Sequence, residues 1–145
     1  MKDSRPYVIG MDFGSDSVRA LLADAENGEI VDSEVVEYPR WKEEQYCDVS
    51  KSQFRQHPKD YLESLATVLS QLTRRNPSQS KQVRALAVDT TGSTPCFTNS
   101  KAVPLSLQED FSEDPDAMFI LWKDHTAQAE SDEINQLMRN QPINY

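Results

Sequence analysis

The first forty residues of the chain alternate between apolar runs and short polar turns. Residues 7–13, 18–23 and 30–38 are the apolar runs, and residues 14–17 and 25–28 separate them. The second turn contains Asn-Gly, a pair that suits the positive φ angles of a tight hairpin turn. Three runs of strand length joined by two short turns predict an antiparallel three-stranded meander.

Residues 58–75 have the apolar spacing of a helix with one buried stripe. A proline at the start of this segment costs little there, because the first helical N–H has no partner in the helix. Two arginines at its end complement the helix dipole, and Asn76-Pro77-Ser78 ends it. Residues 83–88 follow as a nearly continuous apolar run, which predicts a buried strand. The apolar stripe of the helix consists of Tyr61, Leu62, Leu65, Val68, Leu69 and Leu72.

The rest of the chain is less regular. Residues 39–56 are polar and aromatic without a clear period, which predicts a loop or an excursion from the sheet. Residues 96–98 and 103–105 are typical of two short strands around a turn. An acidic loop at residues 109–116 is followed by a compact apolar run at residues 118–122.

We expect Thr126 to cap a final helix that continues to about residue 138, with an inward face formed by Ala129, Ile134, Leu137 and Met138. Residues 141–145 contain no clear terminating element. Hairpins come first along the chain and a helix crossover later, in the order strand, strand, strand, helix, strand. This order predicts an α/β fold with a mixed sheet rather than a doubly wound one. Neither GxGxxG nor GxxxxGK[ST] occurs, so the two standard phosphate sites at helix termini are absent.

Charge and composition exclude several classes of protein. The net charge is −9 and the pI is near 4.6, so the long-range field disfavours non-specific binding to nucleic acid or to an anionic membrane. Leu, Ile, Val and Phe make up about 21% of the 145 residues, just above the level of roughly 20% at which disorder becomes common. We therefore expect a folded chain with a thin core. No apolar run approaches the roughly 18 residues of a membrane span, and the N-terminus does not resemble a secretory signal.

The two cysteines, Cys47 and Cys96, cannot form a disulfide framework. Together with His57 and His125 they would complete a set of four zinc ligands, but no pair of them has the spacing of a zinc finger. Two buried or unused thiols in a reducing cytoplasm are the better interpretation.

The first candidate site is the turn Asp12-Phe13-Gly14-Ser15-Asp16-Ser17. The turn N–H groups can form an anion-binding concavity, and Gly14 allows a ligand to approach the backbone closely. Asp12, at the end of an apolar strand, could hold a hydrated Mg²⁺ beside the same phosphate. The alternative is an ordinary hairpin whose polar side chains bind their own backbone.

Three further segments carry candidate chemistry. Asp89-Thr90-Thr91-Gly92-Ser93-Thr94 again places an aspartate at a strand end, and two such ends in one sheet would form a phosphate–metal cleft. The alternative is a polar turn. Trp122-Lys123-Asp124 could stack on a sugar and bind its hydroxyls; alternatively, Trp122 lies in the core while Asp124 and Thr126 cap a helix. Tyr38-Pro39-Arg40-Trp41 offers a sugar or partner surface, or a loop anchored by its aromatic residues.

Together these segments resemble the N-terminus of the FGGY carbohydrate kinases, within the actin-like ATPase superfamily. The resemblance covers nearly the whole chain and implies the actin-like ribonuclease-H fold, as an incomplete N-terminal domain. The segments at residues 88–95 and 117–127 are most similar to members that phosphorylate L-ribulose. The resemblance is carried by residues 9–20, 38–41, 53–61, 88–95 and 117–127.

The resemblance also implies a role for each matching residue. Asp12 would lie by Mg²⁺ and the transferred phosphate. Gly14, Ser15 and Ser17 would form the phosphate-binding turn. Thr91, Gly92, Ser93, Trp122, Lys123 and Asp124 would line the sugar side of the cleft. Members of the family use MgATP. The resemblance therefore implies a small sugar and MgATP as partners, with no nucleic acid or membrane partner. It also implies a cytoplasmic enzyme of carbohydrate metabolism that is active in arabinose catabolism. Whether the protein forms a homo-oligomer is left open.

One departure from the family is important. Family members are about three to four times longer, and their catalytic base and most of their nucleotide site lie downstream of the matching region. Residues 1–145 would be the N-terminal part of the first kinase domain, with a phosphate-binding hairpin at about 7–38, a helix at about 58–75 and sugar-side segments at about 83–126. The alternatives are a non-catalytic actin-like binding or regulatory module, or a kinase of another ketose or polyol such as xylulose.

Overall fold

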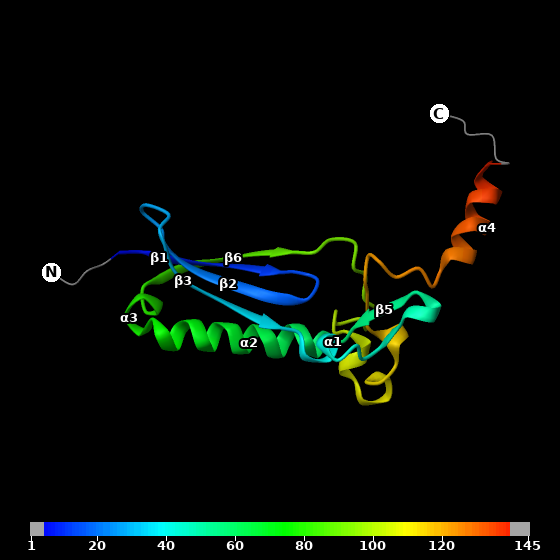
Figure 1. The fold of residues 1–145 in the computed structure, drawn as a ribbon, viewed down its shortest axis with the longest axis horizontal. Coiled ribbons are helices and arrows are strands. Elements are labelled where there is room, and N and C mark those ends of the chain that lie inside the picture. Colours follow the sequence, from blue (N-terminus) through cyan, green and yellow to red (C-terminus); the bar gives the residue numbers. More distant parts are fainter. Residues whose placement is uncertain (1–4, 140–145) are drawn as a thin grey trace.

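A four-stranded mixed sheet covered on one face by a long helix forms the main body of the protein. The computed structural model describes residues 5–139, so the chain end at residues 141–145 lies outside the described part. The strands are β1 (Tyr7–Phe13), β2 (Ser17–Asp24), β3 (Ile30–Glu37) and β6 (Val83–Thr90), in the spatial order β3-β2-β1-β6 (Figure 1). The pairs β1–β2 and β2–β3 are antiparallel, whereas β6 is parallel to β1. The predicted meander and the mixed sheet are confirmed.

Helix α2 (Pro58–Arg75) lies beneath the sheet and forms the crossover before β6 (Figure 1). His57 caps the helix, since its Nδ1 accepts a hydrogen bond from the Lys59 amide at 3.0 Å. Burial and the nearby cations lower the pKa of His57, which favours the neutral ring that this cap requires. Of the predicted stripe, Val68 and Leu72 are buried, but Leu62 is exposed because it lies beyond the part of the helix face that the sheet covers. The buried core consists of Tyr7, Ile9, Met11, Val18, Ala20, Leu22, Tyr38, Val68 and Leu72.

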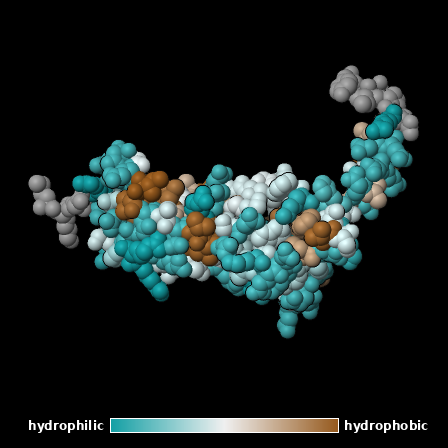
Figure 2. All heavy atoms as spheres, in the orientation of Figure 1, coloured by the Kyte–Doolittle hydropathy of each residue, from teal (hydrophilic) through white to brown (hydrophobic). Residues whose placement is uncertain are grey.

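The expectation that residues 83–88 form a buried strand is only half right. They form β6, but Leu86 and Val88 are 49% and 57% exposed. In the described residues β6 pairs with β1 on one edge alone, and α2 packs mainly against β2 and β3. Apolar side chains are therefore accessible at this edge. Figure 2 shows several apolar patches on the face that it draws.

Residues 39–56 form an excursion of short elements and not a simple loop. Short elements fill this segment: α1 (Pro39–Lys42), β4 (Cys47–Asp48), η1 (Val49–Lys51) and β5 (Gln53–Gln56). Strand β5 pairs with β4 and with β7 (Phe119–Ile120), which makes a small second sheet beside the main one. The sequence lacked a period here because the elements are too short to repeat one, and because buried polar side chains hold them in place.

The C-terminal third contains turns more than strands. The expected strands at residues 96–98 and 103–105 are reduced to one bridge, because Asn99 Oδ1 accepts from two amides and curls the segment into a loop. Helix α4 (Gln128–Arg139) is present, but its predicted inward face is wrong: Ile134, Leu137 and Met138 are exposed, since the helix projects away from the rest of the chain (Figure 1). The remaining short helices are α3 (Pro77–Ser80), η2 (Leu105–Leu107), η3 (Glu109–Phe111) and η4 (Pro115–Ala117). None of the helices within residues 5–139 is long and apolar enough to cross a membrane.

Candidate functional site

The two predicted turns meet at one edge of the main sheet. In the parallel ladder, Asp12 lies beside Asp89 and Phe13 lies beside Thr90. Just beyond the strands, Thr91 donates from its amide to the Phe13 carbonyl at 2.9 Å and from its hydroxyl to the same oxygen at 3.2 Å. The structure thus brings together the two strand ends on which the sequence argument depended.

The backbone carbonyls of the turn between β1 and β2 accept hydrogen bonds from other groups of the chain, and these bonds hold the turn in place. The carbonyl of Ser15 accepts from Gln56 Nε2 at 2.6 Å, that of Asp16 from the Tyr38 amide at 3.0 Å, and that of Ser17 from the Gly14 amide at 3.0 Å. Within residues 5–139 the amides of Ser15 and Asp16 have no acceptor. Two adjacent backbone N–H groups without a protein acceptor are donors that an anion can use.

Neither site glycine is required by packing among the described residues. A Cβ at Gly14 would meet only the Ser17 carbonyl oxygen at 3.5 Å, an ordinary contact, and a Cβ at Gly92 would meet nothing within 4 Å. Free space beside both turns is what a closely approaching ligand would need. Ser93, next to Gly92, has a left-handed backbone with φ 56°, which is uncommon outside glycine and marks this turn as a constrained one.

Arg19 is a residue of this edge that the sequence reasoning left without a role. It faces Asp12 across the hairpin, and both line a hollow of about 260 Å³ that Asp89 also lines. The hairpin length determines this pairing, so counting back from the turn could have identified it. Within the described part of the chain no group of three or more His, Cys, Asp or Glu residues could hold a metal by itself. The exposed Asp12 carboxylate fits a Mg²⁺ ion that keeps waters and phosphate oxygens as its other ligands.

The segment that follows β7 lies close to the second turn, since the Ile120 amide donates to the Pro95 carbonyl at 2.9 Å. Trp122 is 59% exposed, so the alternative that placed it in the core is wrong. The accessible ring is free to stack on a ligand. Thr91 lines a neighbouring groove of about 330 Å³ between α2 and β6, together with Phe13 and Phe119.

Asp124 differs from the other predicted sugar-side residues because its carboxylate is used within the protein. Its Oδ1 accepts from the amide and hydroxyl of Thr126 at 3.0 and 2.6 Å, and its Oδ2 accepts from the Phe54 amide and Arg55 Nε, both at 2.8 Å. The side chain is 2% exposed. Burial alone would raise the pKa of Asp124, but the hydrogen bonds from Arg55 and Thr126 outweigh it and lower the pKa to about 2. Within the described residues, the Asp124 carboxylate therefore accepts four hydrogen bonds from the protein itself.

Arg55 is a buried cation at the centre of these hydrogen bonds, and nothing in its sequence context indicated that. Besides Asp124 it binds the Asp116 carboxylate at 2.9 Å, the Pro115 carbonyl at 3.2 Å and the Thr126 hydroxyl at 2.9 Å. These bonds join β5 to the segment on either side of Trp122. The position of the exposed tryptophan is therefore determined by a buried ionic network.

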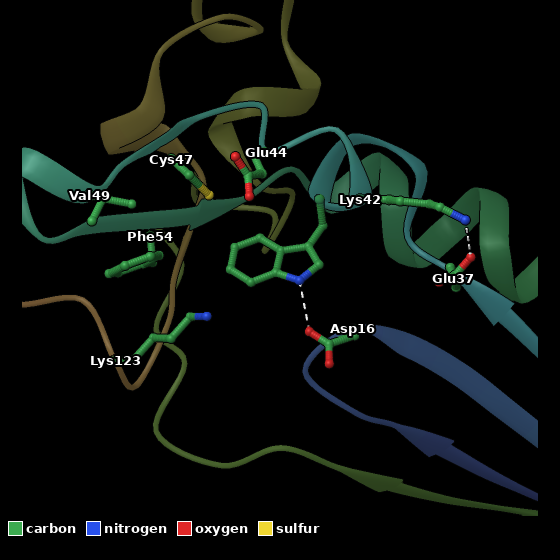
Figure 3. Close-up of a pocket in the computed structure, with 9 residues that line it drawn as sticks. Asp16, Glu37, Lys42, Glu44, Cys47, Val49, Phe54 and Lys123 are labelled. Atoms are coloured by element: carbon green, nitrogen blue, oxygen red, sulfur yellow. Dashed lines mark hydrogen bonds and ion pairs between the residues drawn. The ribbon is translucent and has the colours of Figure 1, made fainter.

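A cavity of about 420 Å³ lies between the first turn and the Trp122 segment (Figure 3). Its walls include the indole of Trp41, the ring of Phe54, and the side chains of Asp16 and Lys123. The ammonium of Lys123 lies 4.6 Å from the centroid of the Trp41 ring and 4.7 Å from that of Phe54. The fourth candidate segment is thus anchored by its aromatic residues and, in addition, contributes a wall to this cavity.

Comparison with solved structures identifies the class of fold. The chain resembles a xylulose kinase from Brucella ovis with a TM-score of 0.71 at 16% identity, over 92% of this chain and 24% of that one. It resembles a gluconate kinase from Lactobacillus acidophilus with a TM-score of 0.70 at 20% identity, over 92% of this chain and 23% of that one. The fold is therefore that of the N-terminal domain of the actin-like sugar kinases.

Sequence comparison then gives the family. The model of the N-terminal domain of the FGGY family of carbohydrate kinases matches residues 7–145. A ribulokinase of Vibrio parahaemolyticus is 47% identical over 132 residues, and a ribulokinase of Geobacillus thermodenitrificans is 33% identical over 138 residues. These alignments cover 90% and 92% of this chain but 23% and 24% of the relatives, so the chain spans about a quarter of their length. The chain belongs to the FGGY family of carbohydrate kinases.

Proposed function

We propose that this chain is the N-terminal part of an ATP-dependent kinase that converts L-ribulose to L-ribulose 5-phosphate. The observation that carries the proposal is the pair of open amides at Ser15 and Asp16, beside the exposed Asp12 carboxylate, at the edge where β1 and β6 end. The net charge of −9 repels phosphate at long range. In this arrangement, backbone N–H donors bind the phosphate in spite of that charge. The identity with ribulokinases supports the choice of sugar.

In this proposal the turn between β1 and β2 positions the phosphoryl group that is transferred. The amides of Ser15 and Asp16 donate to its oxygens, with Gly14 allowing the close approach and Ser17 adding a hydroxyl. Arg19, which lines the hollow beside Asp12, offsets part of the negative charge of the phosphate. Asp12 would hold Mg²⁺, which would neutralise phosphate charge when MgATP is bound. Such positioning and neutralisation supply most of the rate in phosphoryl transfer.

The second turn and the segment after β7 form the sugar side of the cleft. Trp122 stacks its exposed ring on the C–H face of the ketose, and Lys123 donates to a hydroxyl. Thr91, Gly92 and Ser93 line the opposite wall of the cleft. Asp124 contributes indirectly, because its bonds to Arg55 and Thr126 fix the segment that carries the tryptophan.

The 145-residue chain alone should be inactive. It provides one phosphate turn and one wall of the sugar site, whereas transfer requires donor, metal and acceptor to be held together. By resemblance, the catalytic base and the adenosine site lie in the part of the relatives that this chain does not span. We propose a cytoplasmic location and a role in arabinose catabolism on the same resemblance.

The test is a coupled ADP assay on the intact gene product with L-ribulose, D-xylulose, gluconate and glycerol, with the product identified by ³¹P NMR. We expect kcat/KM for L-ribulose to exceed that for D-xylulose at least tenfold. A preference for D-xylulose would assign a different ketose. No stimulation by any sugar would favour a non-catalytic binding module.

A further inference from the structure

Trp41 contacts both sides of the candidate site. Its indole N–H donates to Asp16 Oδ1 at 2.8 Å, on the turn between β1 and β2. The face of the same ring lies under the ammonium of Lys123, which is 4.6 Å from the ring centroid. One rigid ring thus joins the phosphate turn to the sugar side across the cavity of about 420 Å³.

The backbone of Trp41 is fixed independently of these two contacts. The amides of Arg40 and Trp41, at the start of α1, donate to the two carboxylate oxygens of Asp60 at 3.2 and 3.1 Å. Asp60 comes from α2 and is fully buried, and the Arg40 guanidinium binds it at 2.8 Å. A side chain from the long helix therefore supplies the missing cap of a four-residue helix. The backbone of Trp41 is therefore held by α2 independently of the contacts that its ring makes.

The hydrogen bond from the Trp41 indole N–H determines the orientation of the Asp16 carboxylate. Asp16 contributes one of the two open amides of the turn, and its own carboxylate would repel any anion bound there. The indole N–H holds that carboxylate on the side of the cavity where Trp41 lies. The turn is then free to present its amides to phosphate without interference from its own side chain.

The contact with Lys123 gives the other half of the link. Among the described residues the Lys123 ammonium has no carboxylate partner, and it lies between the rings of Trp41 and Phe54, 4.6 and 4.7 Å from their centroids. A cation held by aromatic faces can exchange that contact for a ligand hydroxyl more readily than one held in an ion pair. Movement of Lys123 toward a sugar would release one face of the Trp41 ring.

We propose that Trp41 is a positioning residue that couples occupancy of the sugar side to the geometry of the phosphate turn. The inference rests on the proposed function, because it assigns the two turns to one kinase site. The proposal requires that loss of the indole N–H lowers kcat and that loss of the ring face weakens the binding of the sugar. Coupling of this kind acts equally in both directions for binding.

The experiment measures kcat and ketose KM for variants of the intact protein in the coupled ADP assay. Trp41→Phe keeps a ring face for Lys123 and loses the N–H donor, so kcat should fall at least fivefold while ketose KM changes less than twofold. Trp41→Leu loses the face as well, so ketose KM should rise at least fivefold in addition. Similar effects of the two variants on kcat and KM would overturn the assignment of separate roles.

Asp16 provides matched controls at the other end of the bond. Asp16→Ala removes both the acceptor of the indole N–H and the charge that this bond holds aside. Adding Trp41→Phe to Asp16→Ala should therefore cause no further loss of kcat. A loss of kcat from Trp41→Phe that is equally large in wild type and in the Asp16→Ala background would overturn the proposal. If Trp41 variants fold poorly, the single Asp16 variants decide the question through the spectrum described next, because Asp16 is exposed.

A readout that does not require activity separates this inference from the proposed function. In a ¹⁵N NMR spectrum of the protein, the Trp41 indole N–H resonance is identified by its loss in Trp41→Phe. It should shift in Asp16→Ala and remain near its wild-type position in Asp16→Asn. If wild type shows no sugar-stimulated ADP formation, the proposed function fails. If wild type is active and the chemical shift of the Trp41 indole N–H is the same in Asp16→Ala as in wild type, the inference about Trp41 fails.

Discussion

Strands β2 and β6 belong to the same sheet and have similarly apolar sequences, yet their surroundings differ completely. Leu22 is fully buried on β2, which lies between β1 and β3 and packs against α2, whereas Leu86 on β6 is 49% exposed. The difference comes from neighbours: β2 lies between two strands and over a helix, and in the described residues β6 has one strand on one edge. An apolar run indicates that a strand is suited to burial. Whether the strand is buried depends on the elements that pack against it.

The candidate site lies where β1, which is well packed, ends beside β6, which is largely exposed. The turn that we propose to bind phosphate follows β1, and the turn that we propose to face the sugar follows β6. The first turn is held by bonds to its own carbonyls from Gln56, Tyr38 and Gly14. The second is held mainly by Thr91, through the Phe13 carbonyl. We therefore expect substitutions on the two sides to differ in their effect on stability.

The largest expected effect compares two leucines of the same sheet. Leu22→Ala should lower the free energy of unfolding of the 145-residue chain by about 2–5 kcal/mol, because it empties a filled core position. Leu86→Ala should cost less than about 1 kcal/mol, because half of that side chain is already in contact with water. Urea unfolding followed by circular dichroism measures both. Equal losses would contradict the difference in burial.

Much of the better-packed region could be predicted from the sequence. The three strands and α2 are long enough to show a period, and their ends carry recognisable turns and caps. The elements between α1 and β5 were missed because each is two to four residues long and depends on distant partners such as Asp60 and Arg55. The same limit applies to the site: its two turns were predicted from strand ends, whereas Arg19, Gln56 and Trp41 acquire their places only through pairing and packing.

A smaller effect concerns the buried ion pair that supports Trp122. Asp124→Asn should lower the free energy of unfolding at pH 7 by about 1–3 kcal/mol, as expected for the loss of buried charge-assisted hydrogen bonds. Since the native pKa of Asp124 is lowered to about 2, its contribution is complete above about pH 4, the ordinary range of the unfolded carboxyl, and is lost as the pH falls through about 2. The variant and wild type should therefore converge in acid.

Urea unfolding between pH 2 and pH 7 tests this dependence, with Asp110→Asn as the matched control because Asp110 is exposed on η3. The control should leave stability unchanged across the range. A constant difference between Asp124→Asn and wild type from pH 7 to pH 2 would argue against a role for the charge.

The smallest expected effect on stability is at Trp122. Because the ring is 59% exposed, Trp122→Ala should change the free energy of unfolding by less than about 0.5 kcal/mol. In the intact protein the same variant should raise ketose KM about tenfold and leave the KM for MgATP unchanged, because a stacking surface for the sugar is lost. Phe111→Ala, at another exposed aromatic, should change neither KM. A loss of stability without a change in ketose KM would assign Trp122 to structure.

The central claim is that the edge where β1 and β6 end is the phosphoryl-transfer side of a sugar kinase, and Asp12→Asn in the intact protein tests it most directly. The substitution keeps the shape of an exposed side chain and removes the charge that would hold Mg²⁺ near the open amides. In the coupled ADP assay with L-ribulose, we expect turnover to fall by at least about a hundredfold with ketose KM within threefold of wild type. Turnover within threefold of wild type would remove Asp12, and this edge of the sheet, from the mechanism.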